Sequence, residues 1–254
     1  MRVKFFALLN QCDYGILKKQ TSIYSGVNNV LAYADRRFLM KAFQTSVFLN
    51  LKQEDFYTYI CRCREGEYDI ESVKFSGENF SDENFGALNF DTVCFAHCTF
   101  LSCSFKGDDF KNVRFISCQF AGSKFTGSWL GKCSFENCQL SGADFEECGI
   151  SDVCFEDCMM SIANFTGAKL KDCSFSSCDL TEVYFSECTL KNLELKDNQF
   201  IGTDFFKTKL KGIDFSDSVL QGIRVSDVSD LKGAIVNPYQ TMELIKLLGV
   251  IVKE

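Results

Sequence analysis

The chain has 254 residues and a formal net charge of −7 at pH 7, so it is long enough to bury a core and is acidic overall. No stretch approaches the ~18 consecutive apolar residues that a membrane-spanning helix needs. The apolar run Phe5–Leu9 is too short to be the hydrophobic region of a signal peptide. We therefore expect a cytoplasmic protein without a membrane partner.

Residues 1–69 form the first segment, and they lack the repeat that dominates the rest of the chain. Ser25 is a good N-cap for a helix over residues 27–43, where apolar side chains recur at helical spacing. A second apolar run, Phe56–Ile60, follows two acidic residues. We expect a small, mainly helical element, which serves either as a cap over the first repeats or as a module that binds a partner.

From Ile70 to Val225 an apolar residue recurs at every fifth position, which makes 32 consecutive pentapeptides. A smaller residue, often Cys, Val or Ala, stands two positions earlier in many of them, and the other three residues are mostly polar. A period of five fits neither a helix of 3.6 residues per turn nor an alternating strand. It predicts a coil with four short sides, each of which contributes one large central residue and one small residue to an axial core.

Four sides of five residues bring residues n and n+20 into register, and the sequence supports this stacking. Self-similarity at a short fixed period is typical of stacked repeat architectures. We therefore predict an all-β solenoid over residues 70–225. One side would collect Phe85, Phe105, Phe125, Phe145, Phe165, Phe185 and Phe205, and one column of small residues would hold Cys98, Cys118, Cys138, Cys158 and Cys178.

A few residues depart from this pattern. Glu78, Glu83 and Asp108 stand where a small inward residue is expected, and a buried carboxylate is costly unless it is paired or turned outward. We expect either distorted first coils or contacts between these side chains and the N-terminal segment. Asn198 ends the Cys column and is expected to form hydrogen bonds within the stack.

The cysteines point to packing rather than to chemistry. Ten of the 15 stand on the small inward position, where we expect reduced thiols in a reducing compartment. The alternative is a metal or redox ladder along the Cys column, or a metal site at Cys12, Cys61 and Cys63. The single histidine, His97, falls on an outward position, so the core offers no Ser-His or Cys-His pair. We expect no enzyme activity, no metal and no cofactor.

Residues 226–254 leave the five-residue phase. Asn237 and Pro238 are preferred residue types for the N-cap and first position of a helix, Gly249 for its end, and Val250–Val252 for a short strand. An apolar helix at the end of a finished solenoid needs a cover, from either a second copy about a two-fold axis or simple end-capping. The candidate homodimer interface consists of Tyr239, Met242, Leu244, Ile245, Leu247, Leu248, Val250 and Val252.

The block from 70 to 225 resembles a known family. The motifs Ala143-Asp144-Phe145, Ala163-Asn164-Phe165-Thr166-Gly167 and Thr203-Asp204-Phe205 follow a pattern of small residue, Asp/Asn, Leu/Phe, Ser/Thr and Gly. On these residues the block is similar to the pentapeptide-repeat family. The resemblance implies a right-handed quadrilateral β-helix of about eight coils.

The tail resembles one group within that family. Leu231-Lys232-Gly233-Ala234, Tyr239-Gln240 and Leu248-Gly249-Val250 are similar to the ending of the Qnr and MfpA quinolone-resistance proteins. The resemblance implies a C-terminal helix that forms a head-to-head dimer and an acidic rod that mimics duplex DNA and binds DNA gyrase and topoisomerase IV. The chain differs from plasmid Qnr proteins in that no loop interrupts the repeat and the N-terminal segment is longer.

Charge is unevenly distributed along the chain. Residues 1–69 carry 10 basic and 7 acidic residues, whereas residues 70–225 carry 14 basic and 23 acidic residues, which argues against direct nucleic-acid binding by the repeats. Carboxylates gather on the sides centred on Phe155 and Phe145, which we take to be neighbours, and the side centred on Leu170 is basic. The candidate acidic face for a protein partner consists of Glu136, Asp144, Glu146, Glu147, Glu156, Asp157, Glu187, Glu194 and Asp197.

These patterns favour a non-enzymatic DNA mimic that binds type II topoisomerase and protects it from quinolone-type inhibitors. Three alternatives remain. The outward charges could serve only solubility, the chain could be a self-immunity or adaptor protein that binds another partner through the rod face or the N-terminal element, or it could be a structural scaffold.

Overall fold

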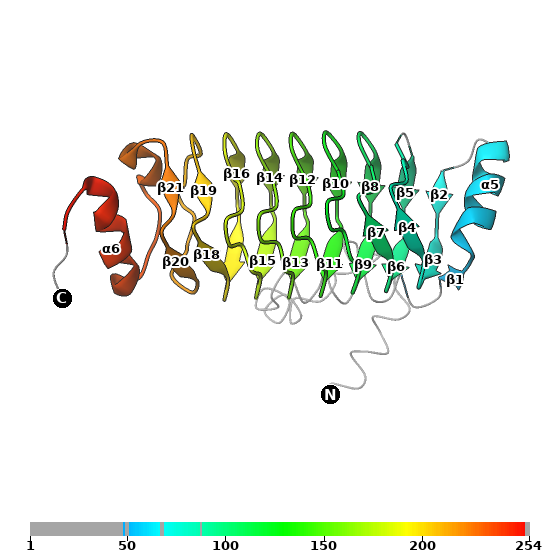
Figure 1. The fold of residues 1–254 in the computed structure, drawn as a ribbon, viewed down its shortest axis with the longest axis horizontal. Coiled ribbons are helices and arrows are strands. Elements are labelled where there is room, and N and C mark those ends of the chain that lie inside the picture. The colour runs from blue at the N-terminus through cyan, green and yellow to red at the C-terminus, as the bar shows by residue number, and fades with distance from the viewer. Residues whose placement is uncertain (1–47, 49–50, 67–68, 87, 252–254) are drawn as a thin grey trace, which may run out of the picture. The chain divides into compact units, whose positions relative to one another are not determined.

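The computed structural model describes residues 48, 51–66, 69–86 and 88–251 (Figure 1). The chain divides into two compact units, Met1–Lys52 and Gln53–Glu254. Only three residues of the first unit are described, so the helix expected over residues 27–43 lies outside the described residues. The second unit holds the repeats.

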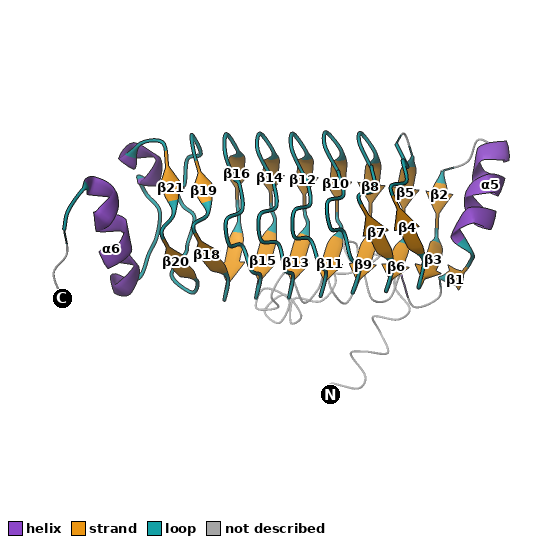
Figure 2. Ribbon diagram, in the orientation of Figure 1, coloured by secondary structure: helices purple, strands orange, loops and turns teal. Residues whose placement is uncertain are grey.

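The second unit is a β-solenoid of about eight turns, built from stacked strands of two to four residues, as predicted (Figure 2). One sheet has the strand order β1 (Lys52–Gln53), β3 (Val73–Ser76), β6 (Cys94–Ala96), β9 (Arg114–Ile116), β11 (Ser134–Glu136), β13 (Cys154–Glu156), β15 (Ser174–Ser176) and β17 (Glu194–Lys196). A second contains β2 (Ile70–Glu71), β5 (Asn89–Asp91), β8 (Asp109–Lys111), β10 (Trp129–Gly131), β12 (Gly149–Ser151), β14 (Lys169–Lys171) and β16 (Thr189–Lys191). Three two-stranded sheets pair β4 (Asn79–Ser81) with β7 (Thr99–Leu101), β18 (Gln199–Ile201) with β20 (Val219–Gln221), and β19 (Asp204–Phe205) with β21 (Arg224–Val225).

Each coil has four sides, which the chain visits in a fixed order. The strand pairs from β2 to β21 are parallel with residues 20 apart in register, as in Leu130 with Ile150 and Phe135 with Phe155. We number the sides by their central residues: side 1 is centred on Phe110, Leu130, Ile150 and Leu170, side 2 on Phe115, Phe135, Phe155 and Phe175, side 3 on Phe120, Leu140, Met160 and Leu180, and side 4 on Phe125, Phe145, Phe165 and Phe185. Because the four sides follow one another around the coil, side 2 lies opposite side 4, and side 1 lies opposite side 3.

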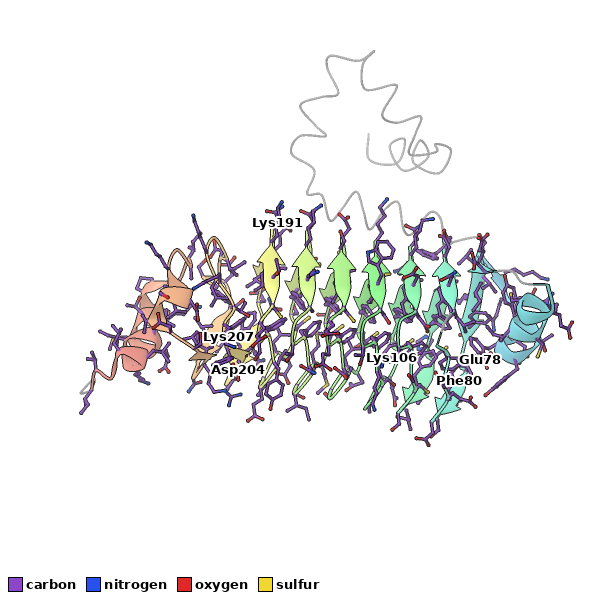
Figure 3. The ribbon with its side chains drawn as sticks, turned by 90° about the horizontal axis from the view of Figure 1, so that it is seen from above. Glu78, Phe80, Lys106, Lys191, Asp204 and Lys207 are labelled. Atoms are coloured by element: carbon purple, nitrogen blue, oxygen red, sulfur yellow. The ribbon has the colours of Figure 1, made fainter. Side chains whose placement is uncertain are left out.

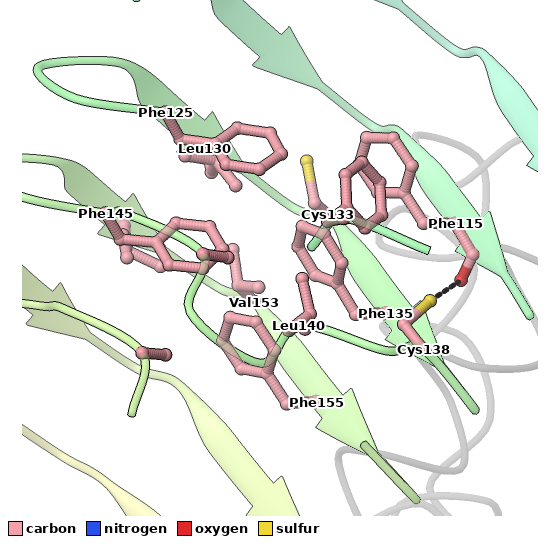
Figure 4. Packing of buried hydrophobic residues seen from close by; sticks show 14 of the residues in the cluster. Phe115, Phe125, Leu130, Cys133, Phe135, Cys138, Leu140, Phe145, Val153 and Phe155 are labelled. Atoms are coloured by element: carbon pink, nitrogen blue, oxygen red, sulfur yellow. Dashed lines mark hydrogen bonds between the residues drawn. The ribbon is translucent and has the colours of Figure 1, made fainter. Parts of the chain in front are cut away.

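The aromatic core is stacked along the solenoid axis (Figure 4). The rings of Phe125 and Phe145, one coil apart on side 4, are nearly parallel, with their centroids 4.8 Å apart. Rings on different sides meet edge to face, as Phe135 and Phe145 do at 6.3 Å and 90°. Both arrangements are favoured geometries for aromatic pairs, so Phe packs well both along the axis and between neighbouring sides.

Several of the small inward residues form the same kind of hydrogen bond, from the side chain to a backbone carbonyl oxygen. The Cys138 thiol donates to the carbonyl oxygen of Phe115 at 3.5 Å, marked in Figure 4, and the Ser128 hydroxyl donates to that of Phe105 at 2.6 Å. In both cases the acceptor lies 23 residues earlier, on the preceding coil. The Asn198 amide donates to the Phe175 carbonyl at 2.9 Å in the same register, which confirms the bond expected of this residue. The position therefore accepts Cys, Ser, Thr or Asn because each is small and has a donor.

The helix α5 (Phe56–Gly66) covers the first coil. Its Phe56 is 2% exposed, and its ring lies 4.6 Å from that of Phe80, centroid to centroid. Glu78 accepts a hydrogen bond from the Phe56 amide and Glu83 accepts one from the Tyr57 hydroxyl, each at 3.4 Å. Glu78 and Glu83, two of the three carboxylates that break the repeat pattern, therefore contact the N-terminal segment, which was one of the two expectations. The third, Asp108, is buried and accepts a hydrogen bond from the Leu88 amide at 3.2 Å instead.

The C-terminal segment covers the last coil. It contains the 3-10 helix η1 (Val228–Leu231), the helix α6 (Pro238–Leu244) and the 3-10 helix η2 (Ile245–Leu248). Asn237 is the N-cap of α6, and Gly249 ends η2 in the left-handed region, as predicted. The Gln240 side chain is buried and donates to the carbonyl oxygens of Phe215 and Ser218, which belong to the last coil. The strand expected over 250–252 is absent at Val250 and Ile251, and Val252 lies outside the described residues.

The strand ladder opens on two sides near this end. The two large sheets stop at β17 and β16, while sides 3 and 4 continue through the β18–β20 and β19–β21 pairs. Leu190, Leu193 and Leu195 are half-buried there and line an apolar cavity of about 10 Å³. Leu193 follows Val153 and Cys173 in its column. We infer that the larger side chain of Leu193 keeps the strands of sides 1 and 2 from pairing with the next coil.

Candidate partner-binding surfaces

The structure separates the predicted acidic face into two. Glu136, Glu156 and Glu194 belong to side 2, with Asp157 and Asp197 at the corner that follows it. Asp144 and Glu146 belong to side 4, and Glu147 and Glu187 lie at its following corner. The expectation that these two sides are neighbours was wrong, because residues ten apart stand on opposite sides of a coil of twenty. The nine carboxylates therefore do not form one continuous face.

On side 2 the negative charge is partly neutralised. Arg114 binds Glu136 through two nitrogens, Nε at 3.0 Å and Nη2 at 2.8 Å from the two carboxylate oxygens. Such a two-bond pair is held firmly and leaves little free charge at Glu136. Asp157, Glu194 and Asp197 are exposed on the same side and its corner.

On side 4 one carboxylate supports the turn and the others face solvent. Asp144 accepts hydrogen bonds from the Glu146 amide at 3.1 Å and from the Asn164 amide group at 3.0 Å, so it has a structural role in the ladder. Glu147 and Glu187 are exposed, and Glu187 forms a surface ion pair with Lys207 at 2.9 Å. Exposed pairs of this kind are weak, so a partner can displace Lys207 from Glu187.

Side 1 is basic, as the sequence predicted. Lys111 pairs with Asp91, Lys171 with Asp172 and Lys209 with Asp230. The hydrogen bond from Lys209, together with one from Ser226, lowers the pKa of the Asp230 carboxyl group. Lys191, which points outward in Figure 3, and Lys169 are exposed on the same side.

The predicted dimer interface is also divided. Leu244 and Leu247 are partly buried and pack against the core, so they serve the cap and are not available as a free surface. Ile245 is half-buried, and Val252 lies outside the described residues. The outward residues are Tyr239 at 87% exposure, Leu248 at 60%, Met242 at 51% and Val250 at 45%.

Burial holds the Cys133 and Cys148 thiols in their neutral form. The cysteines in the described part of the chain are reduced thiols, and burial raises the pKa of the Cys133 and Cys148 thiols to about 12. A nucleophile or a metal ligand needs the thiolate form instead. Among the described residues, no group of three or more His, Cys, Asp or Glu is arranged to hold a metal ion. In the same part of the chain, no helix has the length and apolar character needed to cross a membrane.

One surface feature was not predicted from the sequence. Ile162, Tyr184, Phe206 and Val228 are large apolar residues at outward positions, and each is more than 40% exposed. They recur at an interval of 22 residues. This interval is hard to see in the sequence, because each of the four residues occupies a different position of its pentapeptide.

Two family models match overlapping parts of the solenoid. A model described as pentapeptide repeats (8 copies) matches residues 118–161, and one described as pentapeptide repeat region matches residues 148–225. No curated protein sequence matches the chain.

Several solved structures are similar to this one. Full-length QnrB1, a plasmid-mediated fluoroquinolone resistance protein, is 21% identical, with 72% of this chain and 100% of that chain covered and a TM-score of 0.34. HetL, a pentapeptide repeat protein involved in heterocyst differentiation regulation in the cyanobacterium Nostoc sp. strain PCC 7120, is 13% identical, with 70% and 95% covered and a TM-score of 0.34. Rfr23 from the cyanobacterium Cyanothece 51142 is 13% identical, with 72% and 100% covered and a TM-score of 0.30.

Proposed function

We propose that this chain, a pentapeptide-repeat protein, is a non-enzymatic DNA mimic that binds a type II topoisomerase, DNA gyrase or topoisomerase IV, and protects it from quinolone-type inhibitors. The observation that carries the proposal is the set of outward carboxylates on side 4 and its corner, held in register by the ladder. Duplex DNA presents a regular line of negative charge, and a protein surface that holds DNA is complementary to such a line.

Side 4 is the better candidate of the two acidic sides. Glu147 and Glu187 occupy the same column two coils apart and are both exposed, and Glu146 stands on the adjacent strand position. With a spacing of ~4.8 Å per coil, the two corner carboxylates repeat at about 10 Å. On side 2 the two-bond pair of Arg114 with Glu136 is firmer than the exposed pair of Lys207 with Glu187 on side 4, so a partner gains more readily from the side 4 carboxylate.

We also propose that two copies associate through the C-terminal end. The capping contacts of Gln240 account for one face of the terminal helix, and the exposed apolar residues on the other face remain without an explanation in the monomer. Tyr239, Met242, Leu248 and Val250 fit a self-complementary contact about a two-fold axis.

The test of the topoisomerase proposal is a DNA gyrase supercoiling assay with and without a quinolone. At micromolar concentration the protein is expected to inhibit supercoiling or to restore it in the presence of the drug. The triple variant Glu146→Lys, Glu147→Lys and Glu187→Lys is expected to remove the effect, because it reverses the charge of side 4.

A matched variant reverses three charges on the opposite side: Glu156→Lys, Asp157→Lys and Asp197→Lys. Each triple changes one strand carboxylate and two corner carboxylates that have positive φ, so net charge and backbone demands are equal. The side 2 variant is expected to keep the effect. Absence of inhibition and rescue in the unaltered protein would contradict a topoisomerase partner, and equal effects of both triples would contradict the assignment to side 4.

A further inference from the structure

An oblique apolar stripe crosses side 4. Its members are Ile162 (53% exposed), Tyr184 (41%), Phe206 (44%) and Val228 (41%), which we call the stripe. One coil has 20 residues, so an interval of 22 advances one coil along the axis and two residues along the strand. The stripe therefore runs from the corner before side 4, across that side, to the residues that follow it.

The strand register places the first three members next to one another. Tyr184 is bridged to Asn164 on the coil before and to Asp204 on the coil after, so Ile162 and Phe206 are its diagonal neighbours. With ~4.8 Å between coils and ~3.3 Å per residue along a strand, each diagonal step is about 8 Å, which lies within reach of large side chains. Ile162, Tyr184 and Phe206 at this spacing make a line of about 16 Å. Val228 follows in η1, beyond the last paired strand of this side.

The first member of the stripe, Ile162, has a backbone conformation that isoleucine rarely adopts. Ile162 has φ of 56°, and it is the one large aliphatic residue among the described residues with positive φ. Equivalent residues on neighbouring coils include Gly142 and Gly202, for which this conformation has no steric cost. Ile162 points to solvent, so the strain is not offset by packing in the core. Strain that the fold does not need is a pointer to function.

The second member displaces a turn contact. At the position of Tyr184, neighbouring coils carry Asp144, Asn164 and Asp204, each of which accepts a hydrogen bond from the amide two residues later at 3.1, 3.0 and 2.8 Å. Tyrosine does not make this short contact, because its hydroxyl is too far from its own backbone. Two successive members of the stripe thus replace residues that suit the fold better.

The surroundings of the stripe are acidic. The cations there are Lys207, which pairs with Glu187, and Arg224, which pairs with Asp204 (Asp204 and Lys207 are labelled in Figure 3). The Lys207 ammonium lies 5.2 Å from the centroid of the Phe206 ring, so a cation already rests on one member of the stripe. The carboxylates on side 4 and its corners around the stripe are Asp144, Glu146, Glu147, Glu182, Glu187, Asp204 and Asp227.

We propose that the stripe is a docking site for an amphipathic α-helix of another protein, with an apolar face that covers Ile162, Tyr184, Phe206 and Val228 and with Lys or Arg on both flanks. An added β-strand is a poor fit, because the strand positions of side 4 are already paired with the coils on both sides. A helix of about 11 residues spans ~16 Å at ~1.5 Å per residue and matches a single line of apolar anchors. The proposal does not depend on the partner being a topoisomerase.

The test uses two fluorescent 18-residue peptides, each made of equal numbers of Leu and Lys residues. In the first, Leu residues lie on one helical face, and in the second the same residues are permuted around the helix. Fluorescence anisotropy with the full-length protein is expected to show at least tenfold tighter binding of the first peptide. Equal affinity for both peptides would show that only net charge is recognised and would overturn the proposal.

Substitutions then locate the contact. The variant Ile162→Asn, Tyr184→Asn and Phe206→Thr introduces residue types that suit these positions, so it is expected to fold and to bind the first peptide at least tenfold more weakly. The control Leu101→Ser and Val219→Ser removes two equally exposed apolar side chains from side 3 and is expected to bind normally. Retained binding in the stripe variant, or equal loss in the control, would contradict the site.

A measurement of folding separates the stripe from a structural role. Ile162→Asn alone is expected to raise the melting temperature by about 2–4 °C, because Asn tolerates positive φ better than Ile, while peptide binding weakens. A lowered melting temperature would show that Ile162 serves the fold, and the argument from strain would be wrong.

Discussion

At the scale of single residues, one kind of hydrogen bond recurs in the inner columns. Cys138, Ser128 and Asn198 all donate to a carbonyl oxygen 23 residues earlier, although their side chains differ in polarity. A thiol is the weakest of these donors and the most apolar, so it suits a dry core best. The many cysteines are therefore a consequence of the coil geometry.

This view predicts which thiols react with iodoacetamide in the native protein at pH 8. Cys61 is exposed and Cys154 is half-buried, so both are expected to be alkylated within minutes. Cys133 and Cys148, whose pKa burial raises to about 12, are expected to stay unmodified, because the thiolate fraction at pH 8 is on the order of 10⁻⁴. Peptide mapping by mass spectrometry checks this. Rapid native labelling of Cys133 would show that the core opens locally.

At the scale of elements, the solenoid changes character where β16 and β17 end their sheets. Before that point all four sides are paired, and after it sides 3 and 4 alone connect the coils by strand pairs. The last coil instead receives hydrogen bonds from the C-terminal segment, through Gln240 and Asn237. The opening at Leu193 is thus a boundary between a uniform ladder and a terminal cap.

Leu193→Val tests the cause of the opening. Valine fills the same column at Val153, so the substitution is expected to let sides 1 and 2 close over residues 189–196. Hydrogen exchange of amides in this segment is expected to slow roughly tenfold, which corresponds to about 1.4 kcal/mol in the free energy of local opening. Leu170→Val, in the uniform part of the ladder, is the matched control and is expected to accelerate exchange near its own coil. Unchanged exchange in Leu193→Val would mean that side-chain size does not cause the opening.

At the scale of the whole molecule, both ends of the solenoid are covered by helices that differ in what they leave exposed. Phe56 of α5 is almost fully buried in the first coil, whereas α6 and η2 keep Tyr239 and Leu248 largely exposed. The C-terminal end is therefore the better candidate for contact with a second copy.

Sedimentation equilibrium tests that contact. The unaltered chain, of 28.8 kDa, is expected to sediment at twice this mass, and Tyr239→Asp with Leu248→Asp is expected to restore the mass of one chain. Both residues are outside the core, so the fold is expected to persist, whereas Leu244→Asp would also disturb the cap. Leu101→Asp is the control for an added charge elsewhere. A single-chain mass for the unaltered protein would show that the helix only caps the solenoid.

Most of the fold was predictable because the same pattern of large apolar, small and polar residues recurs in most of the pentapeptides. The register of 20, the Phe columns, the N-cap Asn237 and the helix-ending Gly249 all follow from local residue types. The prediction of one continuous acidic face was wrong for a geometric reason. The pentapeptides of Phe135 and Phe145 are close in sequence, but they lie ten residues apart in a coil of twenty and therefore face opposite directions. The opening at Leu193 depends on the volume of a whole column, and the 22-residue stripe becomes visible once the coil length is known.

The fixed register of 20 residues has a consequence for how such a chain changes in length. Removing or duplicating one coil leaves every outward residue on its original side, because the chain re-enters each side at the same phase. The distance between the two capped ends then changes in increments of ~4.8 Å. The length of the solenoid can therefore change by whole coils, while each of its four sides keeps its direction.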